Sequence, residues 1–167
     1  FVNYDPSMSK SENPIANFVA EGHFVYKVGN NYSVASLENL VNVINNNAGA
    51  TITLFESFVV TTEVTINLNG CTICAPHSAS SALFRVELGG VLTINGEGTV
   101  NSACQTNDSS IAVWAYGGEV TINGGTYTNV GAGADDHYDL IYASWEGEIV
   151  INGGTFICHT PAWTVNQ

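Results

Sequence analysis

Positive charge is scarce in this sequence. Lys and Arg together number 3 against 15 Asp and Glu, which gives a formal net charge of −12 over 167 residues. Only Lys10, Lys27 and Arg85 could neutralise phosphates, so the composition argues against nucleic acid as a partner. The same deficit disfavours anionic membranes and acidic polysaccharides. The sequence also lacks any apolar run of about 18 residues, so no membrane-spanning helix is expected.

Charged residues are few, at 11 %, whereas apolar residues make up 45 %, which is unlike a disordered acidic tail. Val, Ile and Thr are abundant and favour strands, while 17 Gly and many Asn favour turns. This composition predicts an all-β protein with many tight corners. Low Lys content together with abundant Asn and Thr indicates a virion or extracellular location. The chain opens on Phe1 without a signal-like segment, so we expect residues upstream of it.

A short motif recurs at a nearly fixed period. Residues 92–100, 120–127 and 150–156 share an Ile-Asn-Gly sequence, and residues 65–70 hold a weaker copy. A second apolar segment and a Gly-containing turn precede each of the three stronger motifs. Several short strands within a period of about 20 to 30 residues predict a parallel β-solenoid, and parallel crossovers favour a right-handed one. An antiparallel sandwich is the alternative. The Ile residues expected to stack inward are Ile66, Ile94, Ile122 and Ile151.

Residues 36–47 interrupt the β pattern and are predicted to form a short amphipathic helix. Ser36 is a suitable N-cap, and Asn and Gly residues follow the last apolar position. A solenoid exposes its apolar core at the first coil, so we expect this helix to cap that coil. The apolar residues at helical spacing are Leu37, Leu40, Val41 and Ile44.

The chain divides into two parts on this interpretation. Residues 1–35 contain a hairpin, formed by residues 23–28 and 32–34, and are predicted to complete or cap a neighbouring unit. Residues 36–167 form the parallel β-helix, and no lid is apparent after Phe156. An open last coil favours tandem copies in a longer chain or head-to-tail stacking of separate chains, and an arbitrary fragment is the alternative. The residues expected at the assembly contact are Phe1, Val2, Tyr4, Phe18, Val19, Phe24 and Tyr26.

Residues 13–23, Asn-Pro-Ile-Ala-Asn-Phe-Val-Ala-Glu-Gly-His, precede the hairpin. They resemble the closing segment of parallel β-helix modules in bacteriophage virion proteins, particularly head-fibre and tail-associated ones. Residues 36–73, 137–143 and 151–156 are also similar to parts of those modules. The order differs, because the closing segment comes first in this chain, and this favours a tandem or head-to-tail arrangement. The resemblance implies a structural or host-contact role on a virion, with no catalytic residues.

The densest group of acidic residues lies in one predicted loop and contains Asp135, Asp136 and Asp139. A glycoside hydrolase needs two carboxylates about 5 to 10 Å apart. Adjacent residues on an extended chain point in different directions, and no basic cluster accompanies these carboxylates, so we do not expect an enzyme. The loop could hold Ca²⁺ through its oxygens, and no other cofactor is expected.

Four aromatic residues lie in corresponding segments of neighbouring repeats. They are Trp114, Tyr116, Tyr142 and Trp145. Trp114 and Tyr116 share a face, because side chains two apart on a strand point the same way. Facing inward, this group belongs to the core; facing outward, it could stack on surface glycans or pack against another subunit.

Three functions therefore remain open from the sequence. The first is a structural subunit of a virion or extracellular fibre, whose partners are other copies of itself. The second is a glycan-binding adhesion module. The third, a polysaccharide lyase or hydrolase, is disfavoured by the isolated acidic loop.

Overall fold

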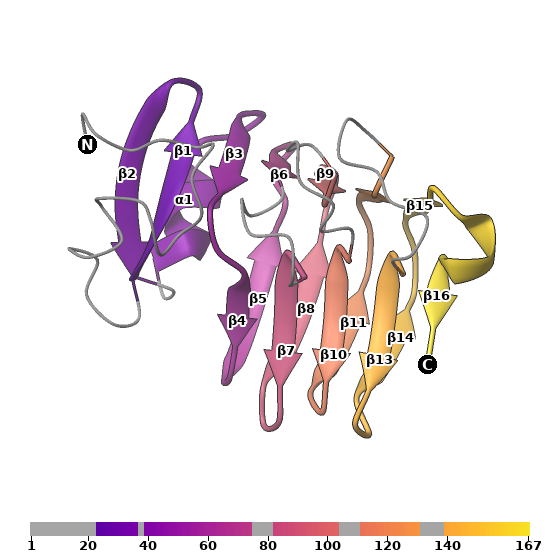
Figure 1. Ribbon diagram of the computed structural model, residues 1–167. Helices are drawn as coiled ribbons and strands as arrows, with labels where there is room; N and C mark the ends of the chain where they lie inside the picture. The colour runs from indigo at the N-terminus through magenta and orange to yellow at the C-terminus, as the bar shows by residue number, and fades with distance from the viewer. Residues whose placement is uncertain (1–22, 37–38, 75–81, 104–110, 131–138) are drawn as a thin grey trace.

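The computed structural model describes residues 23–36, 39–74, 82–103, 111–130 and 139–167. These residues form a parallel β-solenoid, as the repeat predicts, with one short helix and an antiparallel hairpin at the N-terminal end. Successive coils lie side by side along a rod that runs from the hairpin to the C-terminus (Figure 1). Each coil supplies one strand to each of three sheets.

The three sheets are parallel throughout the solenoid. The first contains β4 (Phe58–Val60), β7 (Phe84–Glu87), β10 (Val113–Tyr116), β13 (Ile141–Ser144) and β16 (Val165–Asn166). The second contains β5 (Glu63–Asn67), β8 (Val91–Asn95), β11 (Glu119–Ile122) and β14 (Glu148–Ile151). The third contains β3 (Thr51–Leu54), β6 (Thr72–Cys74), β9 (Thr99–Asn101), β12 (Thr126–Thr128) and β15 (Thr155–Ile157).

The repeated Ile residues form a column in the core. Ile66, Ile94 and Ile122 are fully buried and occupy equivalent register positions on β5, β8 and β11. Ile151 continues the column on β14 but is partly exposed, because no further coil of the described chain covers it. The inward stack expected from the period is thus confirmed, and stacking of identical β-branched side chains aligns successive coils.

Asn residues form a second column, at a corner of the solenoid. Asn123 Nδ2 donates to Asn95 Oδ1 at 2.7 Å, and Asn152 Nδ2 donates to Asn123 Oδ1 at 2.8 Å. We call these three side chains the Asn ladder. Because each amide both donates and accepts, the ladder links neighbouring coils through the same pair of atoms.

The hairpin consists of β1 (His23–Val28) and β2 (Asn31–Ser36), joined by a turn in which Gly29 has a φ of 57°. This confirms the hairpin that the sequence predicts. β1 also pairs antiparallel with β3 of the same chain, from Tyr26 opposite Leu54 to Val28 opposite Ile52. The contact of this hairpin with a neighbouring unit stays a prediction, because its pairing with β3 leaves β2 at the edge of the sheet. Backbone pairing makes them the N-terminal end of this chain's own sheet.

Helix α1 (Leu40–Asn46) covers the first coil, as expected, but is shorter than predicted. Leu40 and Ile44 are fully buried and join the core that contains Ile66. Ser36 is not the N-cap, because β2 extends through Ser36 and pairs it with His23. Asn39 precedes the helix instead, and its Nδ2 donates to Ser36 Oγ at 2.8 Å.

The C-terminal end of α1 is tied to the first coil by Asn69. Its Nδ2 donates to the carbonyl oxygens of Asn45, at 3.2 Å, and Ile44, at 3.4 Å. Asn69 has a φ of 54°, a left-handed conformation that Asn tolerates better than most side chains. The Asn-Gly corner after β5 thus holds the helix through two carbonyl oxygens of its last turn.

The last coil exposes apolar side chains. Val150 on β14 is 52 % exposed and Ile157 on β15 is 48 % exposed. The chain continues through a 3-10 helix (Pro161–Trp163) into β16, which pairs with β13 and was not anticipated. In the described parts of the chain, no helix is both long and apolar enough to cross a membrane.

Candidate functional site

The four aromatic residues singled out from the sequence gather on the outer side of the first sheet. On β10, Val113 and Ala115 are buried, whereas Trp114 and Tyr116 alternate with them and are half-buried. Tyr142 lies opposite Trp114 in the register of β10 and β13. These side chains therefore face outward, and the core interpretation was wrong. We call Trp114, Tyr116, Tyr142 and Trp145 the aromatic surface.

The rings of the aromatic surface contact one another in a continuous row. Ring centroids are 5.7 Å apart for Tyr142 and Trp114, 5.1 Å for Trp114 and Tyr116, and 5.8 Å for Tyr116 and Trp145. Trp114 Nε1 donates to Ser144 Oγ at 2.9 Å. The ring–ring contacts and this hydrogen bond restrict the side chains, so a ligand would meet rings that are already ordered.

Arg85 belongs to the same surface, which the sequence did not indicate. It lies opposite Trp114 in the register of β7 and β10, and its Cζ is 4.9 Å from the Trp114 centroid and 4.5 Å from the Tyr116 centroid. Its Nε is 3.3 Å from Glu87 Oε1, two residues along β7. Arg85 is thus a cation over two aromatic faces with a carboxylate beside it. Arg85 precedes Trp114 by 29 residues, which is one repeat period. That spacing is the sequence signal that could have placed Arg85 beside Trp114.

Trp145 stands in an unusual turn. Gly147 N donates to Ser144 O at 3.0 Å, which closes a four-residue turn whose central residues are Trp145 and Glu146. Their φ angles are 55° and 65°. A turn with positive φ at both central positions normally takes Asn-Gly or Gly-Gly, because other side chains are strained there. The corresponding turns of the two preceding coils place Gly89 and Gly117 at positive φ.

The residue after this strained pair is fixed as Gly for a different reason. A Cβ on Gly147 would lie 2.2 Å from the carbonyl oxygen of Ala115, and the equivalent Gly90 and Gly118 are equally crowded. Packing between coils therefore requires Gly at this last position. Trp145 and Glu146 therefore adopt positive φ in a turn whose counterparts in the two preceding coils place Gly at positive φ.

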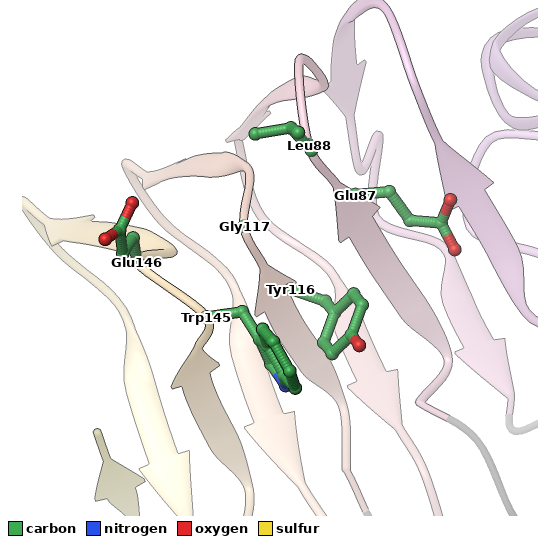
Figure 2. Close-up of a pocket in the computed structure, with 6 residues that line it drawn as sticks. All are labelled: Glu87, Leu88, Tyr116, Gly117, Trp145 and Glu146. Carbon is green, nitrogen blue, oxygen red and sulfur yellow. The ribbon is translucent and has the colours of Figure 1, made fainter.

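A pocket of about 500 Å³ opens at this turn. In Figure 2 the rings of Tyr116 and Trp145 lie side by side, with the Glu146 and Glu87 side chains at opposite ends of the group. Trp145 is 75 % exposed. The lining residues are Glu87, Leu88, Tyr116, Gly117, Trp145 and Glu146.

This arrangement combines two kinds of surface. The rings offer flat apolar faces, and the two carboxylates offer hydrogen-bond acceptors on either side of them. An open pocket of this kind suits a ligand that has an apolar face and a polar rim. None of the described residues that line it is a Ser, Cys or His.

One of the three Asp residues expected to hold calcium belongs to the described part of the chain. Asp135 and Asp136 lie outside the described residues, while Asp139 lies just before β13. Partial burial raises the pKa of the Asp139 carboxyl, and hydrogen bonds from the Asn166 side chain and its own backbone oppose that shift. Within the described ranges, no three His, Cys, Asp or Glu side chains gather as a metal site.

Two of the seven residues expected at the assembly contact belong to the described part of the chain. Phe1, Val2, Tyr4, Phe18 and Val19 lie outside the described residues. Phe24 and Tyr26 both lie in β1, and Tyr26 is half-buried against the core of its own chain. Tyr26 therefore contributes to the N-terminal end of this solenoid.

Similarity to a known protein would help to interpret the solenoid and its aromatic surface. Comparisons of the chain with protein-family models, with curated proteins and with solved structures find no match. The geometry of the site is therefore the basis for the function proposed below.

Proposed function

We propose that the aromatic surface binds carbohydrate, which makes the chain a glycan-binding module. The observation that carries this proposal is Trp145: its side chain is 75 % exposed, lies beside the outward Tyr116, and is held by a backbone conformation that Trp rarely adopts. Strained residues that persist in a fold are concentrated at functional sites.

The chemistry of the pocket supports a sugar rather than a flat apolar ligand. A pyranose ring has a face of C–H groups and a rim of hydroxyls. The rings of Tyr116 and Trp145 can cover the C–H face, while Glu87 and Glu146 can accept hydrogen bonds from hydroxyls. Single apolar residues on a protein surface need no explanation, whereas a contiguous row of outward aromatic side chains indicates an interaction site.

The proposal is tested by measuring oligosaccharide binding to the wild-type chain and to Trp145→Ala and Tyr116→Ala, by glycan array and then by calorimetry. We expect each substitution to weaken binding at least about tenfold, the effect of losing about 1.4 kcal/mol of contact energy at a central aromatic residue. Trp163→Ala, which changes a Trp of the 3-10 helix outside the pocket lining, is the matched control and should bind normally.

Two results would overturn carbohydrate binding. One is the absence of any glycan ligand for the folded wild-type chain. The other is a ligand whose affinity is unchanged in both Trp145→Ala and Tyr116→Ala, because that ligand would occupy some other surface.

A second candidate function is a structural segment of a virion or extracellular fibre, built by stacking along the solenoid axis. The apolar residues of the last coil favour it, since Ile151 and Phe156 pair with the fully buried Ile122 and Tyr127 and so occupy positions that a further coil or a second copy would cover. A virion origin rests on the resemblance of residues 13–23 to closing segments of bacteriophage modules.

Strand direction is compatible with such stacking. β1 runs antiparallel to β3, and β2 runs antiparallel to β1, so β2 has the same direction as β3 and β15. A second copy placed head to tail would therefore meet β15 with a strand of parallel direction. The second strand of the hairpin is what gives this direction, because β1 alone would present a strand antiparallel to β15.

Electron microscopy and sedimentation of the wild-type chain and of Ile151→Lys test the stacking, because Ile151 pairs with the fully buried Ile122. We expect filaments or end-to-end dimers of the wild type, and their loss when a charge enters the last coil. Val130→Lys adds the same charge at another exposed position and should leave assembly intact. Monomers of the wild-type chain at high concentration would overturn non-covalent stacking.

A further inference from the structure

The aromatic surface contains one complete cation site and one incomplete copy of it. Arg85 lies over Tyr116, with its Cζ 4.5 Å from the ring centroid, and Glu87 is its counter-ion at 3.3 Å. One step along the row, Trp145 is the next ring and Glu146 the next carboxylate. Among the described residues, no Lys or Arg lies over Trp145 or forms an ion pair with Glu146.

The charges around the pocket are therefore unbalanced. Arg85 compensates Glu87, whereas Glu146, which lines the same pocket as the exposed Trp145, has no Lys or Arg partner among the described residues. The face of an indole ring attracts cations, and a nearby carboxylate strengthens that attraction. The net charge of −12 adds a field of the same sign.

We propose that the sugar bound at this pocket carries a protonated amino group, which lies over Trp145 with Glu146 as its counter-ion. The ligand thus supplies the cation that Arg85 supplies at the neighbouring ring. This inference rests on the proposed carbohydrate binding, and it adds the chemical class of the sugar. It also implies that uronic acids and other anionic sugars are excluded, because their carboxylates would approach Glu146 without a compensating cation.

The experiment compares short oligomers of equal length made of glucosamine, N-acetylglucosamine or galacturonic acid. Binding is measured by calorimetry at mildly acidic pH, where the free amine is protonated. We expect the glucosamine oligomer to bind about tenfold more tightly than the N-acetylated one, a difference of about 1.4 kcal/mol that the cation–π contact and its counter-ion supply. The galacturonic acid oligomer should show no binding.

Glu146→Gln separates a specific counter-ion from general attraction. This substitution should bring the affinities for the two glucosamine-based oligomers to within about twofold of each other, because the amine loses its partner. Glu148→Gln removes the same charge from an exposed carboxylate that does not line the pocket, and should preserve the preference. A preference reduced equally by both variants would show that the overall negative charge attracts the oligomer, and would overturn the inference.

Failure of this inference is distinct from failure of carbohydrate binding. Equal affinity of the wild-type chain for the amino and N-acetylated oligomers overturns the amino-sugar assignment and leaves carbohydrate binding in place. The absence of binding to all oligosaccharides overturns both. Loss of binding in Trp145→Ala, with a wild-type unfolding midpoint, places the ligand at the proposed ring.

Discussion

Trp145 and Glu146 combine a conformational cost with an exposed position. Each has a positive φ, which costs a residue with a Cβ roughly 1–2 kcal/mol relative to the right-handed conformation. A residue retained for stability would be Gly at these positions, as at Gly89 and Gly117 in earlier coils. Stability and ligand binding should therefore respond in opposite directions when this turn is changed.

Glu146→Gly is expected to raise the free energy of unfolding by about 1 kcal/mol, because Gly adopts positive φ without strain. Urea denaturation monitored by Trp fluorescence measures this change. Glu148→Gly is the matched control: it places Gly at the first residue of strand β14, where φ is not positive, and should lower stability by about 0.5–1 kcal/mol. A decrease for Glu146→Gly would contradict the interpretation of strain.

Tyr127→Phe is expected to lower the free energy of unfolding by about 1 kcal/mol. Tyr127 is fully buried, its ring stacks on Phe156 at 5.2 Å, and its hydroxyl donates to the Gly124 carbonyl at 3.1 Å. Burial also raises the pKa of this hydroxyl, so it remains a donor at all ordinary pH values. Thermal and urea unfolding of the two proteins provide the test, and an unchanged stability would mean that the hydrogen bond contributes nothing.

Asp139→Asn should change how stability depends on pH. Partial burial raises the pKa of Asp139 in the folded protein, so the folded state binds this proton more tightly than the unfolded state. The wild type should therefore gain stability relative to the variant as pH falls through the raised pKa toward the ordinary value of 3.8. Urea midpoints over a pH series measure the difference, and a difference independent of pH would contradict the shift.

At the scale of single residues, the sequence indicated part of the candidate binding site. Period-two alternation placed Trp114 and Tyr116 on one face, and the repeat period placed Tyr142 beside them. Whether that face was inside or outside depended on Val113 and Ala115 filling the core, which the period alone does not determine. Glu146 was missed because a positive φ in a Trp-Glu pair contradicts ordinary turn preferences.

Helix α1 depends on an interaction outside itself. It has seven residues, which is too few for an isolated helix to be stable in water. Its buried residues Leu40 and Ile44 and the hydrogen bonds from Asn69 attach it to the first coil. The corner that ends β5 is therefore part of the N-terminal cap.

Asn69→Ala is expected to lower the free energy of unfolding by about 1–2 kcal/mol, since it removes both amide hydrogen bonds and places Ala at positive φ. Asn69→Gly keeps the conformation and removes only the hydrogen bonds, so its cost should be smaller. Asn67→Ala, an exposed position on β5, is the control. Urea denaturation and helical circular dichroism report the effects, and equal costs for Ala and Gly would exclude a conformational contribution from Asn69.

Element boundaries were predictable only where local sequence determines them. The hairpin turn and the short strands follow from Gly-Asn pairs and alternating residues. The start of α1 did not, because pairing of Ser36 with His23 extends β2 over the expected N-cap. β16 was missed because two residues carry no detectable pattern, and its partner β13 lies more than 20 residues earlier in the chain.

The whole solenoid differs in protection between its two ends. The first coil is covered by α1 and the hairpin, whereas β14 and β15 expose residues that are buried at equivalent positions of β11 and β12. Stability in repeat proteins is carried by contacts between neighbouring units, so a unit with one neighbour is less stable. This difference should be measurable in the 167-residue chain.

Amide hydrogen exchange should be fastest in β14, β15 and β16 and slowest in β5 and β8. We expect the terminal strands to exchange by local opening, with protection lower by at least about tenfold, or about 1.4 kcal/mol. Mass spectrometry of peptides from the two ends measures this, and the self-associated fraction should show the difference abolished if stacking covers the last coil. Uniform protection in a monomer would contradict the gradient.

The overall architecture was easier to predict from the sequence than the element boundaries or the site residues. A motif repeated every 28 or 29 residues, with no helical pattern between strands, leaves few folds other than a parallel solenoid. Antiparallel pairing between β1 and β3 was not predictable from the period, because the hairpin lies outside the repeat. The attachment of residues 23–36 to their own chain therefore required the three-dimensional structure.

The Asn ladder has a consequence for how such a protein changes through gene duplication. The side chains of Asn95, Asn123 and Asn152 hydrogen-bond to their equivalents one coil away, so an inserted coil that is a copy of its neighbour carries both the donor and the acceptor that it needs. Duplication of part of a coil would break the ladder and move the inward Ile residues out of register. The protein can therefore evolve a longer rod in steps of one coil, while the turn at Trp145 and Glu146 diversifies independently in each copy.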